Sequence, residues 1–74
     1  MLNISGIGSS YVLYPDGDKV IVSARSLGEA NVQMILEPLG GGGNAATAGA
    51  QIAGKTVEQV LAELLASIDN FYKQ

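Results

Sequence analysis

The sequence predicts a small α/β domain of order β-β-α-β-α, in which a mixed sheet packs against two helices. Two β-rich runs flank a turn near the start, and two later segments carry apolar residues at helical spacing. With 74 residues, the chain fits one domain, predicted over 1–74, near the lower size limit for a core that needs no disulfide or metal.

The first predicted element is a β-hairpin with strands near 10–14 and 19–25. Its turn is Pro15-Asp16-Gly17-Asp18, in which proline presets φ and glycine supplies a positive φ. Side chains alternate between the two faces of a strand. The second strand therefore presents Val20, Val22 and Ala24 on one face and Ile21, Ser23 and Arg25 on the other.

A short helix is expected next, because apolar residues recur at helical spacing: Val32, Ile35, Leu36 and Leu39. Asn31 can serve as its N-cap, and Ser26 is an alternative that would form a capping box with Glu29. Pro38 ends or distorts the helix, and Gly40 then takes a left-handed conformation.

A short strand at roughly 48–53 and a long amphipathic helix complete the prediction. Thr56 caps this helix and Gln59 completes its capping box. One apolar stripe follows through residue 72: Val57, Val60, Leu61, Leu64, Leu65, Ile68, Phe71 and Tyr72. The predicted partner of this stripe is the sheet.

Composition excludes several function classes. The chain has no His and no Cys, so the usual general base, thiol nucleophile and imidazole ligand are missing. Its seven carboxylates are not spaced to gather three around a metal, and Asp16-Gly17-Asp18 is interpreted as a turn rather than a calcium loop. We therefore expect no catalytic residue, metal ligand or cofactor within this chain.

Net charge and hydropathy limit the kinds of partner that this chain can bind. The net charge of −3 argues against binding of double-stranded nucleic acid, although one local anion site is compatible with it. No run approaches about 18 consecutive apolar residues, and the start lacks the features of a signal peptide. A soluble domain without direct membrane contact is expected.

The segment 37–54 contains four consecutive glycines, from Gly40 to Gly43, followed by small residues. One interpretation is a helix cap followed by a flexible connector. The other is a backbone nest, in which Gly41, Gly42 and Gly43 present amides to a phosphate. Arg25 would supply the cation and Ser23 lies on the same strand face, whereas a strand arginine by itself is more often a surface charge.

Four blocks in order and spacing closely resemble the DHH-associated domain of DHH phosphoesterases: Ser23-Ala24-Arg25-Ser26, Asn31-Val32-Gln33, Leu39 to Gly43, and Ala48-Gly49-Ala50-Gln51. Within that family the sequence looks most like the C-terminal domain of membrane-anchored cyclic di-AMP phosphodiesterases. The resemblance covers nearly the whole chain.

The resemblance implies a division of labour within a longer protein anchored in the bacterial membrane, of which this chain would be a cytoplasmic domain. A preceding DHH domain would bind two manganese ions and hydrolyse cyclic di-AMP to linear pApA. This domain would hold the adenine dinucleotide substrate, and the resemblance transfers contacts with its phosphate and neighbouring groups to Arg25, Gly41, Gly42 and Gly43. Ser23, on the strand face of Arg25, and Asn44, at the end of the glycine loop, complete the predicted site.

Asn44 departs from the family, whose loop ordinarily ends Gly-Gly-Gly-His. Asparagine still donates an amide hydrogen bond to a phosphate oxygen, but it does not become cationic or shuttle a proton. A loop residue without contact to any ligand is the alternative interpretation of Asn44.

Two other functions remain open. One is the substrate-binding domain of a DHH exonuclease that acts on short oligonucleotides, or of a phosphatase that acts on a 3′-phosphorylated adenosine nucleotide. The other is a non-enzymatic module that pairs two copies through a sheet edge or the apolar helix stripe.

Overall fold

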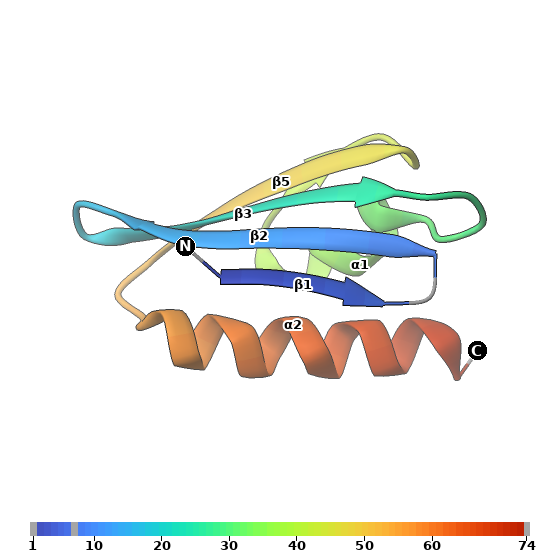
Figure 1. Ribbon diagram of the computed structural model, residues 1–74. Coiled ribbons are helices and arrows are strands. Elements are labelled where there is room, and N and C mark those ends of the chain that lie inside the picture. Colours follow the sequence, from blue (N-terminus) through green and yellow to red (C-terminus); the bar gives the residue numbers. More distant parts are fainter. Residues whose placement is uncertain (1, 7, 74) are drawn as a thin grey trace.

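The computed structural model describes residues 2–6 and 8–73 of the chain (Figure 1). It contains one five-stranded sheet in the order β1-β2-β3-β5-β4. The strands are β1 (Leu2–Gly6), β2 (Ser9–Asp16), β3 (Lys19–Ser26), β4 (Gly42–Gly43) and β5 (Thr47–Ala53). The helices are α1 (Val32–Leu36), followed directly by the 3₁₀ turn η1 (Glu37–Leu39), and α2 (Val57–Tyr72).

The predicted α/β fold class is confirmed, but the expectation of a mixed sheet is wrong for the strands described. All four pairings are antiparallel. The link from β3 to β5 returns the chain antiparallel to β3, since α1 and η1 are too short to carry it back along the sheet. The prediction also missed two strands, β1 and the glycine pair of β4.

The β2–β3 hairpin is longer than predicted and turns more tightly. Pro15 and Asp16 still belong to β2, and Asp16 pairs with Lys19 across a two-residue turn. Gly17 has φ +63°, which explains the glycine at this position. A two-residue turn fixes the register of the whole hairpin, so Ser10 lies opposite Arg25.

Both predicted helix starts are confirmed, with Asn31 rather than Ser26 as the cap of α1. The Asn31 side chain accepts a hydrogen bond from the Met34 amide at 3.2 Å. Thr56 and Gln59 form the predicted capping box of α2. Gly40 ends the η1 turn with φ +85°.

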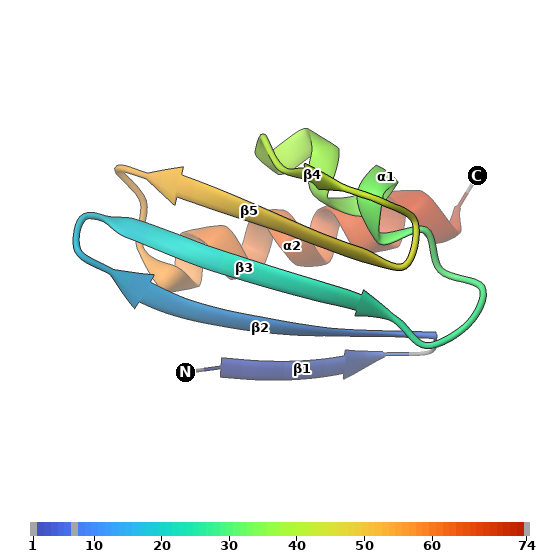
Figure 2. The same cartoon turned by 90° about the horizontal axis from the view of Figure 1, so that it is seen from above.

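The two helices cover one face of the sheet and leave the other face uncovered (Figures 1 and 2). Alternate residues of β2, β3 and β5 point into the core, where they meet residues of α1 and α2. The fully buried side chains of this core include Leu13, Val22, Ile35, Leu36 and Leu64. Ser67 of α2 also donates a hydrogen bond to the Ile35 carbonyl of α1.

The apolar stripe of α2 is narrower than predicted. Val60 and Leu64 are fully buried, whereas Leu65 and Tyr72 are about half exposed. Within the residues described, neither helix is long and apolar enough to cross a membrane.

The adjacent leucines of α2 offer a matched test of this packing. Leu64→Ala should lower the free energy of unfolding by about 2–5 kcal/mol, because it opens a cavity in the core. Leu65→Ala should change it by less than about 1 kcal/mol, since Leu65 is 48 % exposed and alanine favours the helix. Urea denaturation measures both values, and equal losses would contradict the packing.

Ionisation of the Tyr11 phenol should make the stability of the domain depend on pH in the alkaline range. Burial raises the pKa of its phenol above the ordinary value of about 10, while the hydrogen bond with Ser9 at 2.7 Å acts in the opposite direction. The unfolded chain therefore ionises first. Stability should be fully present below about pH 10 and decline as the pH rises toward the folded-state pKa.

Denaturation of the wild type and of the double variant Ser9→Ala/Tyr11→Phe between pH 8 and 11 measures this decline. The double variant removes both hydroxyls, so no buried group is left unpaired. Its loss of stability above pH 10 should be smaller than that of the wild type. Equal declines would contradict the role of Tyr11.

Candidate functional site

The uncovered sheet face carries small and polar side chains in cross-strand rows. In one row, Ser10 of β2, Arg25 of β3 and Thr47 of β5 lie opposite one another. In the next row, Ser23 of β3, Gly49 of β5 and Gly42 of β4 are paired. Strand alternation brings the two rows onto the same face, as predicted for Ser23 and Arg25.

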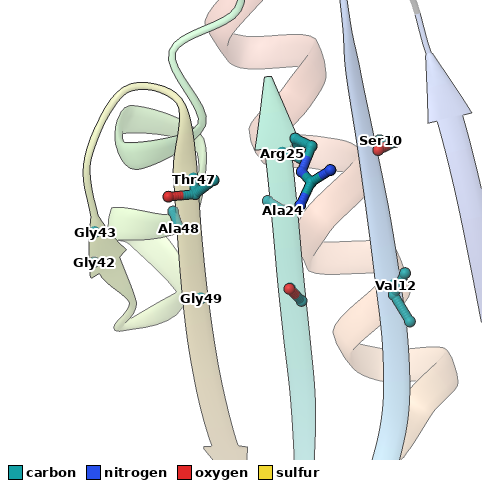
Figure 3. A pocket seen from close by; sticks show the side chains of 10 residues that line it. Ser10, Val12, Ala24, Arg25, Gly42, Gly43, Thr47, Ala48 and Gly49 are labelled. Atoms are coloured by element: carbon teal, nitrogen blue, oxygen red, sulfur yellow. The ribbon is translucent and has the colours of Figure 1, made fainter. Parts of the chain in front are cut away.

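Arg25 is the charged side chain of these two rows. Figure 3 shows its side chain on the sheet face, on the strand next to Thr47. Within the described residues its guanidinium has no ion pair and no hydrogen bond. Lys55 and Lys73, by contrast, each pair with a carboxylate of α2. The Arg25 fork is therefore available to a ligand.

A shallow depression of about 510 Å³ lies around Arg25 (Figure 3). Three hydroxyl side chains line it, those of Ser10, Ser23 and Thr47. None of the described residues that line it carries a carboxylate. One guanidinium with hydroxyl groups around it suits an anion, and its planar donors match the oxygens of a phosphate.

The glycine loop forms one wall of the depression because two of its residues approach β5 too closely for a side chain. A Cβ on Gly41 would lie 2.5 Å from the Gly49 carbonyl oxygen. A Cβ on Gly43 would lie 2.4 Å from the Thr47 carbonyl oxygen, and its φ of +146° also favours glycine. Packing alone thus explains Gly41 and Gly43.

Gly42 is different, because a Cβ there would meet nothing within 4 Å. The fold leaves room for a side chain at this position, so packing does not account for the glycine. A bare backbone at the rim of a depression allows close approach by a ligand.

The loop is not the nest that its sequence suggests. Gly42 and Gly43 form strand β4 at the edge of the sheet, and the Gly41 amide donates to the Leu36 carbonyl at 3.0 Å. The Gly41 amide is therefore used to end the helical segment. Contact between Gly41 and a ligand would have to use other atoms of the residue.

Asn44 shapes the loop that leads into β5. Its side-chain oxygen accepts hydrogen bonds from the amides of Ala46 and Thr47, both at 2.9 Å. Asn44 does not line the depression around Arg25. Its side-chain NH₂ remains as a donor, and its binding role stays a prediction.

The depression thus brings together Ser23, Arg25, Gly42 and Gly43 of the predicted set, while Gly41 lines an adjoining one. Sequence reasoning missed Ser10 and Thr47. Ser10 was within reach, because a two-residue turn at Gly17-Asp18 places it opposite Arg25. Thr47 depends on the long-range register of β3 with β5, for which the sequence has no local signal.

Comparison with known families shows to which family the sequence belongs. The model of the DHHA1 domain matches residues 1–74. This chain belongs to the DHHA1 domain family. The DHHA1 match confirms the resemblance to DHH-associated domains that the ordered blocks indicated.

Three relatives of this DHHA1 domain are named as cyclic-di-AMP phosphodiesterases. The chain is 42 % identical to PdeA of Listeria monocytogenes, and 40 % identical to GdpP of both Geobacillus thermodenitrificans and Bacillus subtilis. Each match covers 99 % of this chain but only 11 % of the relative. The chain therefore spans about a tenth of the length of these proteins.

Within the residues described, the DHHA1 domain gathers no three acidic side chains that could hold a metal ion. The resemblance assigns the two manganese ions to a preceding DHH domain and not to these residues. No step of chemistry is therefore assigned to a metal on this domain.

The three loop glycines should respond differently to alanine. Gly41→Ala and Gly43→Ala should each lower the free energy of unfolding by about 1–3 kcal/mol, since the methyl group meets the β5 backbone. Gly42→Ala should leave stability unchanged or raise it by up to about 1 kcal/mol. Thermal denaturation of the three variants tests this order, and a destabilised Gly42→Ala would show that packing explains this glycine too.

Proposed function

We propose that this DHHA1 domain binds the phosphate of an adenine dinucleotide, as the substrate-binding domain of a longer phosphodiesterase that hydrolyses cyclic di-AMP to linear pApA. The observation that carries the proposal is the free Arg25 guanidinium in a depression lined by hydroxyls and no described carboxylate. Three relatives at 40–42 % identity are named as cyclic-di-AMP phosphodiesterases, which supports the choice of substrate.

Arg25 has the leading role in this mechanism. Its two parallel N–H donors would hold two oxygens of one phosphate, with Ser10, Ser23 and Thr47 as neutral donors around it. Gly42 would let the phosphate rest close to the backbone at the rim. Such contacts orient the substrate and hold its charge, which lowers the entropic part of the barrier.

Hydrolysis itself belongs, in this proposal, to a DHH domain of the same protein. That domain would hold two manganese ions, which supply an activated water at neutral pH. The DHHA1 domain would lie in the cytoplasm against the DHH domain, in a protein anchored to the bacterial membrane. Asn44, at the end of the glycine loop, would donate to the substrate through its side-chain amide.

Binding to the 74-residue chain tests the proposal. Cyclic di-AMP should cause saturable amide shifts in the NMR spectrum, centred on residues 23–25, 42–43 and 47. Arg25→Ala should weaken binding by about 2–3 kcal/mol, because a charge-assisted bidentate contact is lost. Arg25→Lys should recover only part of the loss, since an ammonium does not match two oxygens at once.

Lys19→Ala is the matched control, because it removes the same charge from the same strand and face. Lys19 lies about 20 Å from Arg25 along β3, beyond the screening length at physiological salt. Equal losses of affinity for Lys19→Ala and Arg25→Ala would show that only the net charge of the chain matters for binding. An Arg25→Ala chain that binds like the wild type would refute the assignment.

The same titration separates the competing functions. Tighter binding of a short oligoadenylate or of 3′-phosphoadenosine 5′-phosphate than of cyclic di-AMP would favour the exonuclease or phosphatase. A chain that self-associates in light scattering and shows no shifts with any nucleotide would favour the interaction module.

A further inference from the structure

A second depression, of about 450 Å³, adjoins the one around Arg25 on the same sheet face. The two share Ser23, Gly42 and Gly49, which form the middle cross-strand row. The side walls are continuous as well, because Gly40 and Gly41 extend the rim that Gly42 and Gly43 begin. A ligand held at Arg25 can therefore continue across the face without crossing a barrier of side chains.

The floor of the second depression is a row of different chemistry. Tyr14 of β2, Ile21 of β3 and Gln51 of β5 lie opposite one another. The row thus offers an aromatic ring, an aliphatic side chain and a carboxamide, and it carries no charge. This is the surface that a nucleobase recognises: a π-face and an apolar edge for stacking, with one polar group for its hydrogen-bonding edge.

The Gln51 carboxamide and the Tyr14 hydroxyl make no hydrogen bond within the described part of the fold. The Gln51 side chain is exposed and makes no hydrogen bond with any residue the structure describes. Tyr14 is 39 % exposed on the uncovered face, and its hydroxyl likewise has no described partner. Cross-strand contact with Ile21 accounts for part of the choice of tyrosine, but not for the carboxamide beside it.

The spacing of the rows matches one nucleotide. Ser23 and Ile21 are two residues apart on β3, which separates their rows by about 7 Å. A phosphate held between Arg25 and the Ser23 row would leave its ribose above Ser23 and its base above Ile21. The glycines at the rim leave the space beside β5 open for that base.

We infer that Tyr14, Ile21 and Gln51 form a base platform, on which Gln51 selects adenine over guanine. The inference rests on the proposed phosphate site. A carboxamide donates to N7 and accepts from the N6 amino group of adenine at once, whereas guanine presents two acceptors on that edge. Tyr14 supplies the ring against which the base lies, so Tyr14 sets affinity and Gln51 sets base preference.

Affinities of the 74-residue chain for cyclic di-AMP and cyclic di-GMP, measured by NMR titration, test the platform. The wild type should prefer the adenine ligand by about tenfold. Tyr14→Val should lose about fivefold or more in affinity for cyclic di-AMP, while Tyr14→Phe keeps it, because only the ring is needed. Valine retains the preference for a strand, so the sheet is preserved.

Gln51→Ala should bring the ratio of the two affinities close to one, with a smaller change in affinity for either ligand. Gln33→Ala, on the helix-covered side of the domain, is the matched control and should keep the wild-type ratio. Amide spectra and thermal midpoints of all variants establish that each one is folded.

The outcomes separate this inference from the function on which it rests. Suppose that the wild type binds cyclic di-AMP, that Arg25→Ala abolishes this binding, and that Tyr14→Val binds as tightly as the wild type. The base platform is then refuted and the phosphate site stands. An unchanged adenine preference in Gln51→Ala refutes the role of Gln51. A wild type that binds neither dinucleotide at millimolar concentration refutes both proposals.

Discussion

The close approach of the glycine loop to β5 is the constraint on which the functional face depends. At Gly41 and Gly43 there is no room for a Cβ against the β5 backbone, so β4 can join the sheet only with glycine at both positions. That contact brings the end of the α1 segment to the edge of the sheet and builds the rim of both depressions. The amide of Gly41 reinforces the same junction through the Leu36 carbonyl. The glycine loop therefore forms the edge of the sheet. Its lack of side chains follows from the close packing against β5.

The division between the two sheet faces explains how so small a domain keeps one face of its sheet open. Both helices pack on one face, where the apolar residues of β2, β3 and β5 gather. The other face carries hydroxyl side chains, glycines and Arg25 around the first depression, and Tyr14, Ile21 and Gln51 in the row beyond it. Arg25 stays free because the carboxylates lie elsewhere: among described residues, those in ion pairs are Glu63 and Asp69 of α2. A net negative chain thus keeps one local site for an anion.

Much of this structure could be predicted from short sequence motifs, whereas the pairing of strands far apart in the sequence could not. The caps at Asn31 and Thr56 and the left-handed Gly40 follow from short motifs, and the structure has all three. The antiparallel sheet and strand β4 depend on how the chain returns from β3, which no neighbouring residues specify. The site divides in the same way. Ser23 and Arg25 share a face by alternation alone, whereas Thr47 and Gly42 join them only through pairing across β5.

The charge of the proposed ligand limits how much of that ligand this sheet face could bind. A cyclic dinucleotide carries a negative charge on each of its phosphates, and the depression supplies one guanidinium. Asn44 adds no charge, and its side-chain oxygen is already held by two amides of its own loop. In the proposed complex, one phosphate would be neutralised here, and the charge of the other would have to be met by groups outside these residues. A metal-bearing surface opposite the uncovered face would meet it, which is the arrangement that the proposed division of labour requires.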